Sequence, residues 1–132
     1  MGATILHIEG NYHIREIIRE LLAEYYGYEI LAAETISIAW SLVESEAPDL
    51  IILDIRLPDG CGLDFCRELR KRGSNIPVLF LNSRTRDADR RFIPEIVNQL
   101  ECLEAGGNSY FTKPTDLEEI AAEVERLLAN QH

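Results

Sequence analysis

The chain has 132 residues, the size of a single domain, and its 46% apolar and 27% charged residues are ordinary for a globular protein. A formal net charge of -10 argues against non-specific attraction to nucleic acids or anionic membranes, and no apolar run approaches the length of a membrane span. The three cysteines are odd in number and lack metal-ligand spacing, so we expect reduced thiols and a cytoplasmic location.

The first part of the chain alternates strands with helices. An apolar strand at 3–8 precedes a helix that Gly27 can end. The expected buried stripe of this helix is Ile14, Ile17, Ile18, Leu21, Leu22 and Tyr25. A second strand at 28–32 leads to a helix from Thr35, and the fully apolar segment 50–53 is a third strand. Continuous apolar strands between amphipathic helices favour a parallel sheet covered on both faces.

The middle of the chain begins with a turn at Pro58-Asp59-Gly60. A helix that ends at Gly73 follows, and then an apolar strand at 76–81. The next segment, 82–92, has no clear period. It carries four arginines, which are Arg84, Arg86, Arg90 and Arg91.

The last part of the chain adds two helices and one strand. Pro94 suits the first turn of a helix. The expected buried stripe of that helix is Ile96, Val97, Leu100 and Leu103. A short strand at 110–112 precedes the final helix, for which Thr115 and Glu118 match a capping box. Five βα units in one domain, residues 1–132, predict an α/β, doubly wound fold.

The predicted fold indicates where to look for chemistry, because ligands of doubly wound sheets bind beyond the carboxyl ends of the strands. The residues at these ends are Glu9 and Gly10, Asp54, Asn82 and Ser83, and Lys113 and Pro114. Carboxylates, amide and hydroxyl donors and a lysine together would make a site for a divalent ion and a phosphoryl group.

Two stretches resemble the receiver domains of two-component response regulators. Residues 48–63, PDLIILDIRLPDGCGL, are similar to the receiver stretch that carries the phospho-accepting aspartate. Residues 105–107, AGG, and 110–114, YFTKP, resemble the second receiver signature. The resemblance covers nearly the whole chain. It implies a flavodoxin-like (βα)5 parallel sheet, and right-handed crossovers favour the strand order 2-1-3-4-5.

The resemblance also implies a role for individual residues. Asp54 would take a phosphoryl group from a histidine kinase or phosphotransfer protein. Lys113 would bind the phosphoryl oxygens, and Tyr110 would change its exposure between the inactive and active states. The divalent ion would be Mg²⁺, bound by Glu9, Asp54 and the backbone carbonyl of Arg56. Phosphorylation would then switch a surface recognised by an output protein or domain.

The sequence departs from the family in three places. Gly10 replaces the second acidic residue after the first strand, so we expect Mg²⁺ to bind weakly. Asn82 stands where a hydroxyl residue is usual; its amide could bind the phosphoryl group, as could Ser83 if the register shifts by one. The segment 83–105 is longer than in the family. One of its arginines could supply positive charge opposite Asp54, although the favoured explanation is that the arginines offset local acidity or contact an acidic partner.

Three other functions remain as alternatives. A degenerate receiver would act as a phosphorylation-independent interaction module; Gly10 and Asn82 favour it, whereas Asp54 and Lys113 oppose it. A phosphatase of the haloacid-dehalogenase type is disfavoured, because Arg56 stands where that class needs a general-acid aspartate. A flavodoxin is disfavoured because its hydroxyl-rich phosphate loop is absent after the first strand. We expect a signalling module and no enzyme, without direct nucleic-acid or membrane binding, and homodimer formation is left open.

Overall fold

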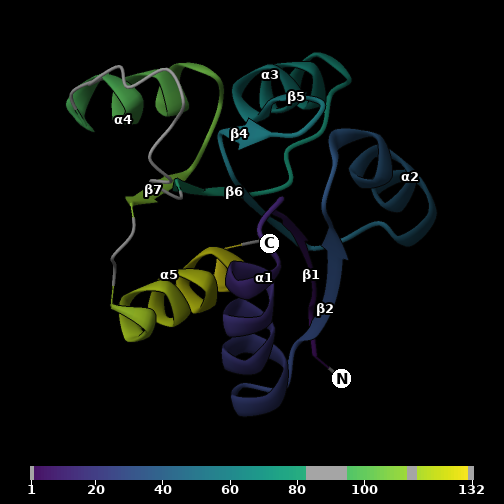
Figure 1. The fold of residues 1–132 in the computed structure, drawn as a ribbon, viewed down its shortest axis with the longest axis vertical. Coiled ribbons are helices and arrows are strands. Elements are labelled where there is room, and N and C mark those ends of the chain that lie inside the picture. Colours follow the sequence, from purple (N-terminus) through teal and green to yellow (C-terminus); the bar gives the residue numbers. More distant parts are fainter. Residues whose placement is uncertain (1, 83–94, 113–115, 131–132) are drawn as a thin grey trace.

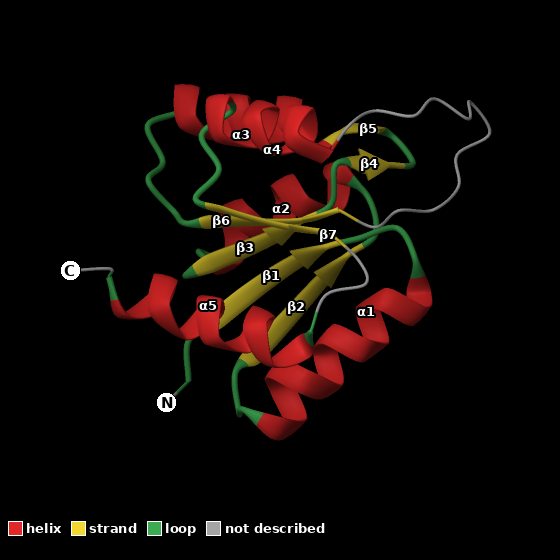
Figure 2. Ribbon diagram, turned by 90° about the vertical axis from the view of Figure 1, so that its left-hand side faces the viewer, coloured by secondary structure: helices red, strands yellow, loops and turns green. Residues whose placement is uncertain are grey.

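The computed structural model describes residues 2–82, 95–112 and 116–130, and these form three layers with a parallel sheet in the middle (Figures 1 and 2). The strands of this sheet are β1 (Thr4–Ile8), β2 (Glu29–Ala33), β3 (Leu50–Leu53), β6 (Val78–Asn82) and β7 (Ser109–Thr112). Their order is β2-β1-β3-β6-β7, with every neighbouring pair parallel. The predicted order 2-1-3-4-5 is therefore confirmed.

Helices cover both faces of the sheet. One face carries α1 (Tyr12–Arg19), its π-helical continuation η1 (Glu20–Tyr25) and α5 (Leu117–Ala129), as Figure 2 shows below the sheet. The other face carries α2 (Ile36–Glu46), α3 (Gly62–Lys71) and α4 (Glu95–Glu104). All four residues of β3 are buried, because this central strand has a helix layer on each side. None of the described helices has the length and apolarity needed to cross a membrane.

A short antiparallel hairpin lies outside the main sheet and follows the end of β3. It pairs β4 (Arg56–Leu57) with β5 (Gly60–Cys61). The turn between them was predicted at Pro58-Asp59-Gly60 and is confirmed. The Asp59 carboxylate accepts hydrogen bonds from the backbone N–H groups of Ile36 (2.8 Å) and Ser37 (3.1 Å) at the start of α2. The bond from Ile36 is the main reason why the pKa of Asp59 is lowered.

The predicted buried stripe of the first helix was partly wrong. Ile18 and Leu22 are fully buried, but Ile17 is 42% exposed and Tyr25 is 81% exposed. The helix changes from α to π geometry at Glu20, and a π-helix has more residues per turn than an α-helix. Tyr25, at the end of the π-helical segment, therefore leaves the face that a regular helical period predicts, but this change does not explain the exposure of Ile17, which precedes it.

The predicted stripe of α4 was wrong at Leu100 and Leu103, whereas the side chains of Ile96 and Val97 lie outside the described part of the structure. Leu100 and Leu103 are 52% and 51% exposed, whereas Cys102 is buried. The chain packs tightly just after this helix, where a β-carbon on Gly107 would lie 2.6 Å from the Phe80 ring and 2.9 Å from the Cys102 carbonyl oxygen. Cys102, and not the two leucines, thus faces the core.

The cap of α5 lies one residue later than predicted. Asp116 has an extended backbone, and its carboxylate accepts a hydrogen bond from the Glu118 N–H at 3.0 Å. Thr115, the predicted cap, lies outside the described residues. Aspartate is the stronger choice at this position because its charge also interacts favourably with the helix dipole.

Candidate functional site

The ends of neighbouring strands lie side by side at the carboxyl edge of the sheet, where the arrowheads in Figure 2 lie. Ile8 pairs with Leu53 in the β1–β3 register, so Glu9 and Asp54 follow paired positions on adjacent strands. The Asp54 N–H donates to the Ile8 carbonyl at 3.0 Å, which extends this pairing by one residue. The structure thus brings together Glu9 and Asp54 as predicted. The predicted site residues Lys113 and Ser83, and the arginines Arg84, Arg86, Arg90 and Arg91, lie outside the described residues.

Asp54 is buried, with 3% of its surface exposed. Its Oδ1 accepts a hydrogen bond from the Ile55 N–H at 2.8 Å. The chain then returns at Gly62, whose N–H donates to the Ile55 carbonyl at 2.6 Å. A β-carbon on Gly62 would overlap the Asp54 carbonyl oxygen. The position of the Asp54 backbone therefore depends on a glycine at the start of α3.

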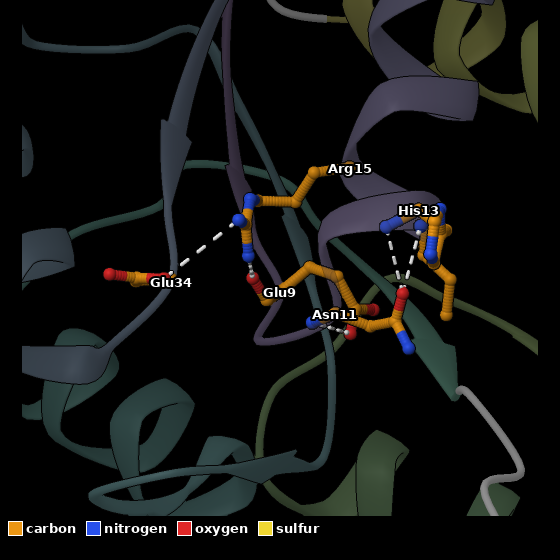
Figure 3. Close-up of polar contacts among 6 residues, drawn as sticks. Glu9, Asn11, His13, Arg15 and Glu34 are labelled. Carbon is orange, nitrogen blue, oxygen red and sulfur yellow. Dashed lines mark hydrogen bonds and ion pairs between the residues drawn. The ribbon is translucent and has the colours of Figure 1, made fainter.

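Glu9 is equally buried, at 1% exposure, and belongs to the turn between β1 and α1. Its Oε2 accepts a hydrogen bond from the Asn11 N–H at 3.0 Å. The Asn11 Oδ1 in turn accepts from the N–H groups of His13 (2.9 Å) and Ile14 (3.2 Å), so Asn11 caps α1 (Figure 3). One short turn thus starts the helix and holds the acidic side chain.

Arg15, a residue of α1, also contacts this turn and was not predicted from the sequence. Its Nη1 donates to the Glu9 carbonyl at 2.8 Å, and its Nη2 lies 3.8 Å from the Glu34 carboxylate (Figure 3). The Arg15 side chain is only 17% exposed. Glu34 follows β2, so the contact joins the ends of two strands to α1. No local pattern could reveal it, because it depends on β2 lying beside β1.

Gly10 stands where the second acidic residue is usual. Its φ lies outside the left-handed region. A β-carbon there would lie 3.2 Å from Pro58 Cδ and 3.4 Å from Pro58 Cγ, with the Glu34 carbonyl at 3.8 Å. A larger side chain at this position therefore requires a shift of the proline ring by a few tenths of an ångström. The backbone itself does not require glycine.

The donor atoms at this edge suit a hard cation. Glu9 and Asp54 provide two buried carboxylates, and oxygen ligands of this kind are the ones that Mg²⁺ prefers. Within the described part of the chain, no group of three or more histidine, cysteine or acidic side chains is arranged to hold a metal ion. The two carboxylates therefore carry less negative charge than three would, and weak Mg²⁺ binding stays a prediction.

Asn82 and Tyr110 contact each other beside this pair. The Asn82 Nδ2 donates to the Tyr110 hydroxyl at 3.3 Å, a long hydrogen bond. Tyr110 is partly buried and packs against the core on the side of α2, α3 and α4. The side chain proposed to bind a phosphoryl group is therefore linked to the side chain proposed to switch.

Comparisons with known proteins agree with this geometry. A family model described as the response regulator receiver domain matches residues 5–125. The response regulator MprA of Mycolicibacterium vanbaalenii is 33% identical over 97% of this chain and 51% of its own length. The chain therefore spans about half the length of the curated relatives that it matches.

Solved structures show the same likeness. A putative response regulator from Chloroflexus aurantiacus superposes with a TM-score of 0.86 at 25% identity, over 98% of this chain and all of the other. The BeF3-activated receiver domain of Klebsiella pneumoniae RstA gives a TM-score of 0.81 at 25% identity, over 95% and 97% of the two chains.

Proposed function

Because this chain belongs to the response regulator receiver domain family, we propose that Asp54 accepts a phosphoryl group and that the transfer switches a protein-interaction surface. As a receiver domain of a two-component response regulator, the chain is a signalling module rather than a classical enzyme. The donor would be a histidine kinase or a phosphotransfer protein. The three free thiols, Cys61, Cys66 and Cys102, are consistent with the reducing cytoplasm in which we place this reaction.

The observation that carries the proposal is the pair of buried carboxylates at the carboxyl edge, Glu9 and Asp54. An oxygen of Asp54 would form a bond to phosphorus as the phosphorus–nitrogen bond of a phosphohistidine breaks, and the leaving imidazole nitrogen takes up a proton. The Ile55 N–H already holds Oδ1 and so orients the carboxylate for attack.

A divalent ion would assist this step. Glu9, Asp54 and the backbone carbonyl of Arg56 would hold Mg²⁺, which when bound offsets the negative charge of the phosphoryl oxygens. Gly10 supplies no ligand, so we propose that water fills the remaining positions and that the affinity is low. Lys113, Asn82 and Ser83 would bind the phosphoryl oxygens.

The response to phosphorylation would pass through Asn82. Its amide now donates to Tyr110, and a phosphoryl group on Asp54 would compete for the same donor. Loss of that bond would release the Tyr110 ring and alter the surface of α4, β7 and α5. The output protein or domain would recognise this surface.

A degenerate receiver is the second candidate function. The absence of an acid at Gly10 and the engagement of Asn82 by Tyr110 favour it. It would use the same fold as an interaction module without phosphorylation.

Incubation with acetyl phosphate and Mg²⁺, followed by intact-protein mass spectrometry, distinguishes the two functions. We expect the added mass of one phosphoryl group in the wild type and none in Asp54→Asn. The matched control is Asp64→Asn, an aspartate on α3 that is 76% exposed and paired with Arg67, which should behave as the wild type. An unmodified wild type would support the degenerate receiver, and modification of Asp54→Asn would show that the acceptor is wrong.

A further inference from the structure

We propose that Arg15 is a positioning residue: it fixes the β1–α1 turn, orients Glu9, and thereby sets the affinity of the edge for a divalent cation. The inference rests on the proposed function only in taking Glu9 and Asp54 as the cation ligands. The observation behind it is that the Arg15 guanidinium holds the backbone of Glu9, the acidic residue next to Gly10.

The turn that carries Glu9 is held by hydrogen bonds from three directions. The Glu9 N–H donates to the Ala33 carbonyl at 2.9 Å, which ties it to β2. The Glu9 carbonyl accepts from Arg15 Nη1 at 2.8 Å, and the Glu9 carboxylate accepts from the Asn11 N–H at 3.0 Å. Gly10, in the middle of this turn, has no side chain with which to fix it. The orientation of Glu9 therefore depends on these bonds.

Arg15 is itself held firmly enough to act as a support. Its side chain is largely buried, and its guanidinium carbon lies 5.8 Å from the centre of the Tyr12 ring. The planar guanidinium can contact the Glu9 carbonyl and the Glu34 carboxylate at the same time, which a lysine ammonium on a flexible stem does poorly. Replacement of Arg15 would thus free one side of the turn.

Positioning and simple electrostatics predict opposite results here. A positive charge close to a cation site should weaken cation binding, so loss of Arg15 would then tighten it. The Glu34 carboxylate lies 3.8 Å from the Arg15 guanidinium, so its negative charge offsets most of the effect of the Arg15 charge on a cation bound at the site. The positioning effect should therefore dominate, and loss of Arg15 should weaken cation binding.

The test compares Arg15→Met with Arg15→Lys and with the matched control Arg19→Met. Arg19 lies one turn further along α1 and pairs with Glu16 and Glu24, away from the site. Mg²⁺ affinity is measured by calorimetric titration at fixed ionic strength. We expect the dissociation constant to rise on the order of tenfold in Arg15→Met, less in Arg15→Lys, and not at all in Arg19→Met.

Amide hydrogen exchange of Asn11 without Mg²⁺ provides a second readout, because this N–H is the donor to the Glu9 carboxylate. We expect faster exchange in Arg15→Met and unchanged exchange in Arg19→Met. Unchanged or tighter Mg²⁺ binding, or unchanged Asn11 exchange, would overturn the inference. If Arg15→Met does not fold, Glu34→Gln loosens Arg15 without removing it and should speed Asn11 exchange in the absence of Mg²⁺, and unchanged exchange would overturn the inference.

Failure of this inference can be separated from failure of the proposed function. If wild-type Asp54 takes no phosphoryl group, but Arg15→Met still weakens Mg²⁺ binding and speeds Asn11 exchange, the phosphorylation proposal fails and the role of Arg15 stands. If the wild type is phosphorylated and Arg15→Met changes neither property, the role of Arg15 fails alone.

Discussion

Gly62 lies against the backbone carbonyl of Asp54, in a space that has no room for a β-carbon. The contact joins the first residue of α3 to the proposed phospho-acceptor. Any side chain at position 62 must displace the segment that follows β3, and with it the Asp54 carboxylate.

Gly62→Ala should therefore impair phosphorylation of Asp54 by on the order of a hundredfold, as expected when a reacting group is displaced by about an ångström. The rate of mass increase with acetyl phosphate measures this. Gly73→Ala is the control: Gly73 has a φ of 87° and no neighbouring atom within 4 Å of an added β-carbon. It should lose about 1–2 kcal/mol of stability and retain the rate. Equal rates in Gly62→Ala and the wild type would contradict the prediction.

Gly10→Asp should tighten Mg²⁺ binding. The φ of Gly10 lies outside the left-handed region, so aspartate can adopt this backbone, and only the Pro58 ring must move slightly. The added carboxylate supplies the charge that the site lacks, and we expect an affinity gain on the order of tenfold in calorimetric titration. Gly10→Asn, which adds a similar volume without the charge, is the matched control. Equal affinities in wild type and Gly10→Asp would show that the ligand assignment is wrong.

Asn82→Ala and Tyr110→Phe should separate the two proposed uses of Asn82. Both variants remove the hydrogen bond between these side chains, which at 3.3 Å should contribute no more than about 1 kcal/mol to the free energy of unfolding. Only Asn82→Ala should also slow phosphorylation of Asp54, because it alone removes the amide that would donate a hydrogen bond to the phosphoryl group. Tyr25→Phe, at a tyrosine that is 81% exposed, serves as a control. Slower phosphorylation in Tyr110→Phe alone would refute this division of roles.

Arg70→Met should destabilise the fold strongly. The Arg70 guanidinium donates to the Gly106 carbonyl (3.0 and 2.8 Å), the Ser74 carbonyl (3.1 Å), the Ile76 carbonyl (2.7 Å) and Asn108 Oδ1 (3.1 Å). Its loss leaves several partly buried acceptors unsatisfied, so we expect about 2–4 kcal/mol lower stability in urea unfolding. Arg67→Met removes only an exposed ion pair with Asp64 and should cost less than about 1 kcal/mol. Similar losses in both variants would argue against this role of Arg70.

The buried Cys102 thiol should be unreactive in the native protein. Burial raises its pKa to about 12 and also raises the pKa of Cys66, so almost no thiolate forms near neutral pH. Iodoacetamide at pH 8 should therefore alkylate the partly exposed Cys61 first, and urea should abolish the difference. Rapid native alkylation of Cys102 would contradict its burial.

The same pKa shift predicts a loss of stability at high pH. The thiol of Cys102 ionises near pH 9 in the unfolded chain and near pH 12 in the folded one, so unfolding releases a proton between these values. The stabilising contribution is complete below pH 9 and declines as pH rises towards 12. In Cys102→Ala, the free energy of unfolding should depend less steeply on pH in this range. If the free energy of unfolding depends on pH equally in both proteins, the pKa of Cys102 is not raised as stated.

Much of the fold and part of the site follow from local sequence. The apolar segment 50–53 predicts a central buried strand, and Asn11 and Gly27 mark the beginning and end of the first helical segment. Alternation of such segments led to the strand order, because right-handed crossovers allow few arrangements. The sequence also shows the motif around Asp54 and the replacement of an acidic residue by Gly10. Apart from the strand order, each of these features depends on residues within a few positions of one another.

Tertiary structure decided the rest. Arg15 contacts Glu9 and Glu34 only because β2 lies beside β1, and Asn82 reaches Tyr110 only through the β6–β7 pairing. The exposure of Leu100 and Leu103 on α4 was likewise decided by packing, which buries Cys102 instead. Periodicity shows that a helix has an apolar face but does not fix its rotation, because packing distance and neighbouring side chains determine which residues are covered.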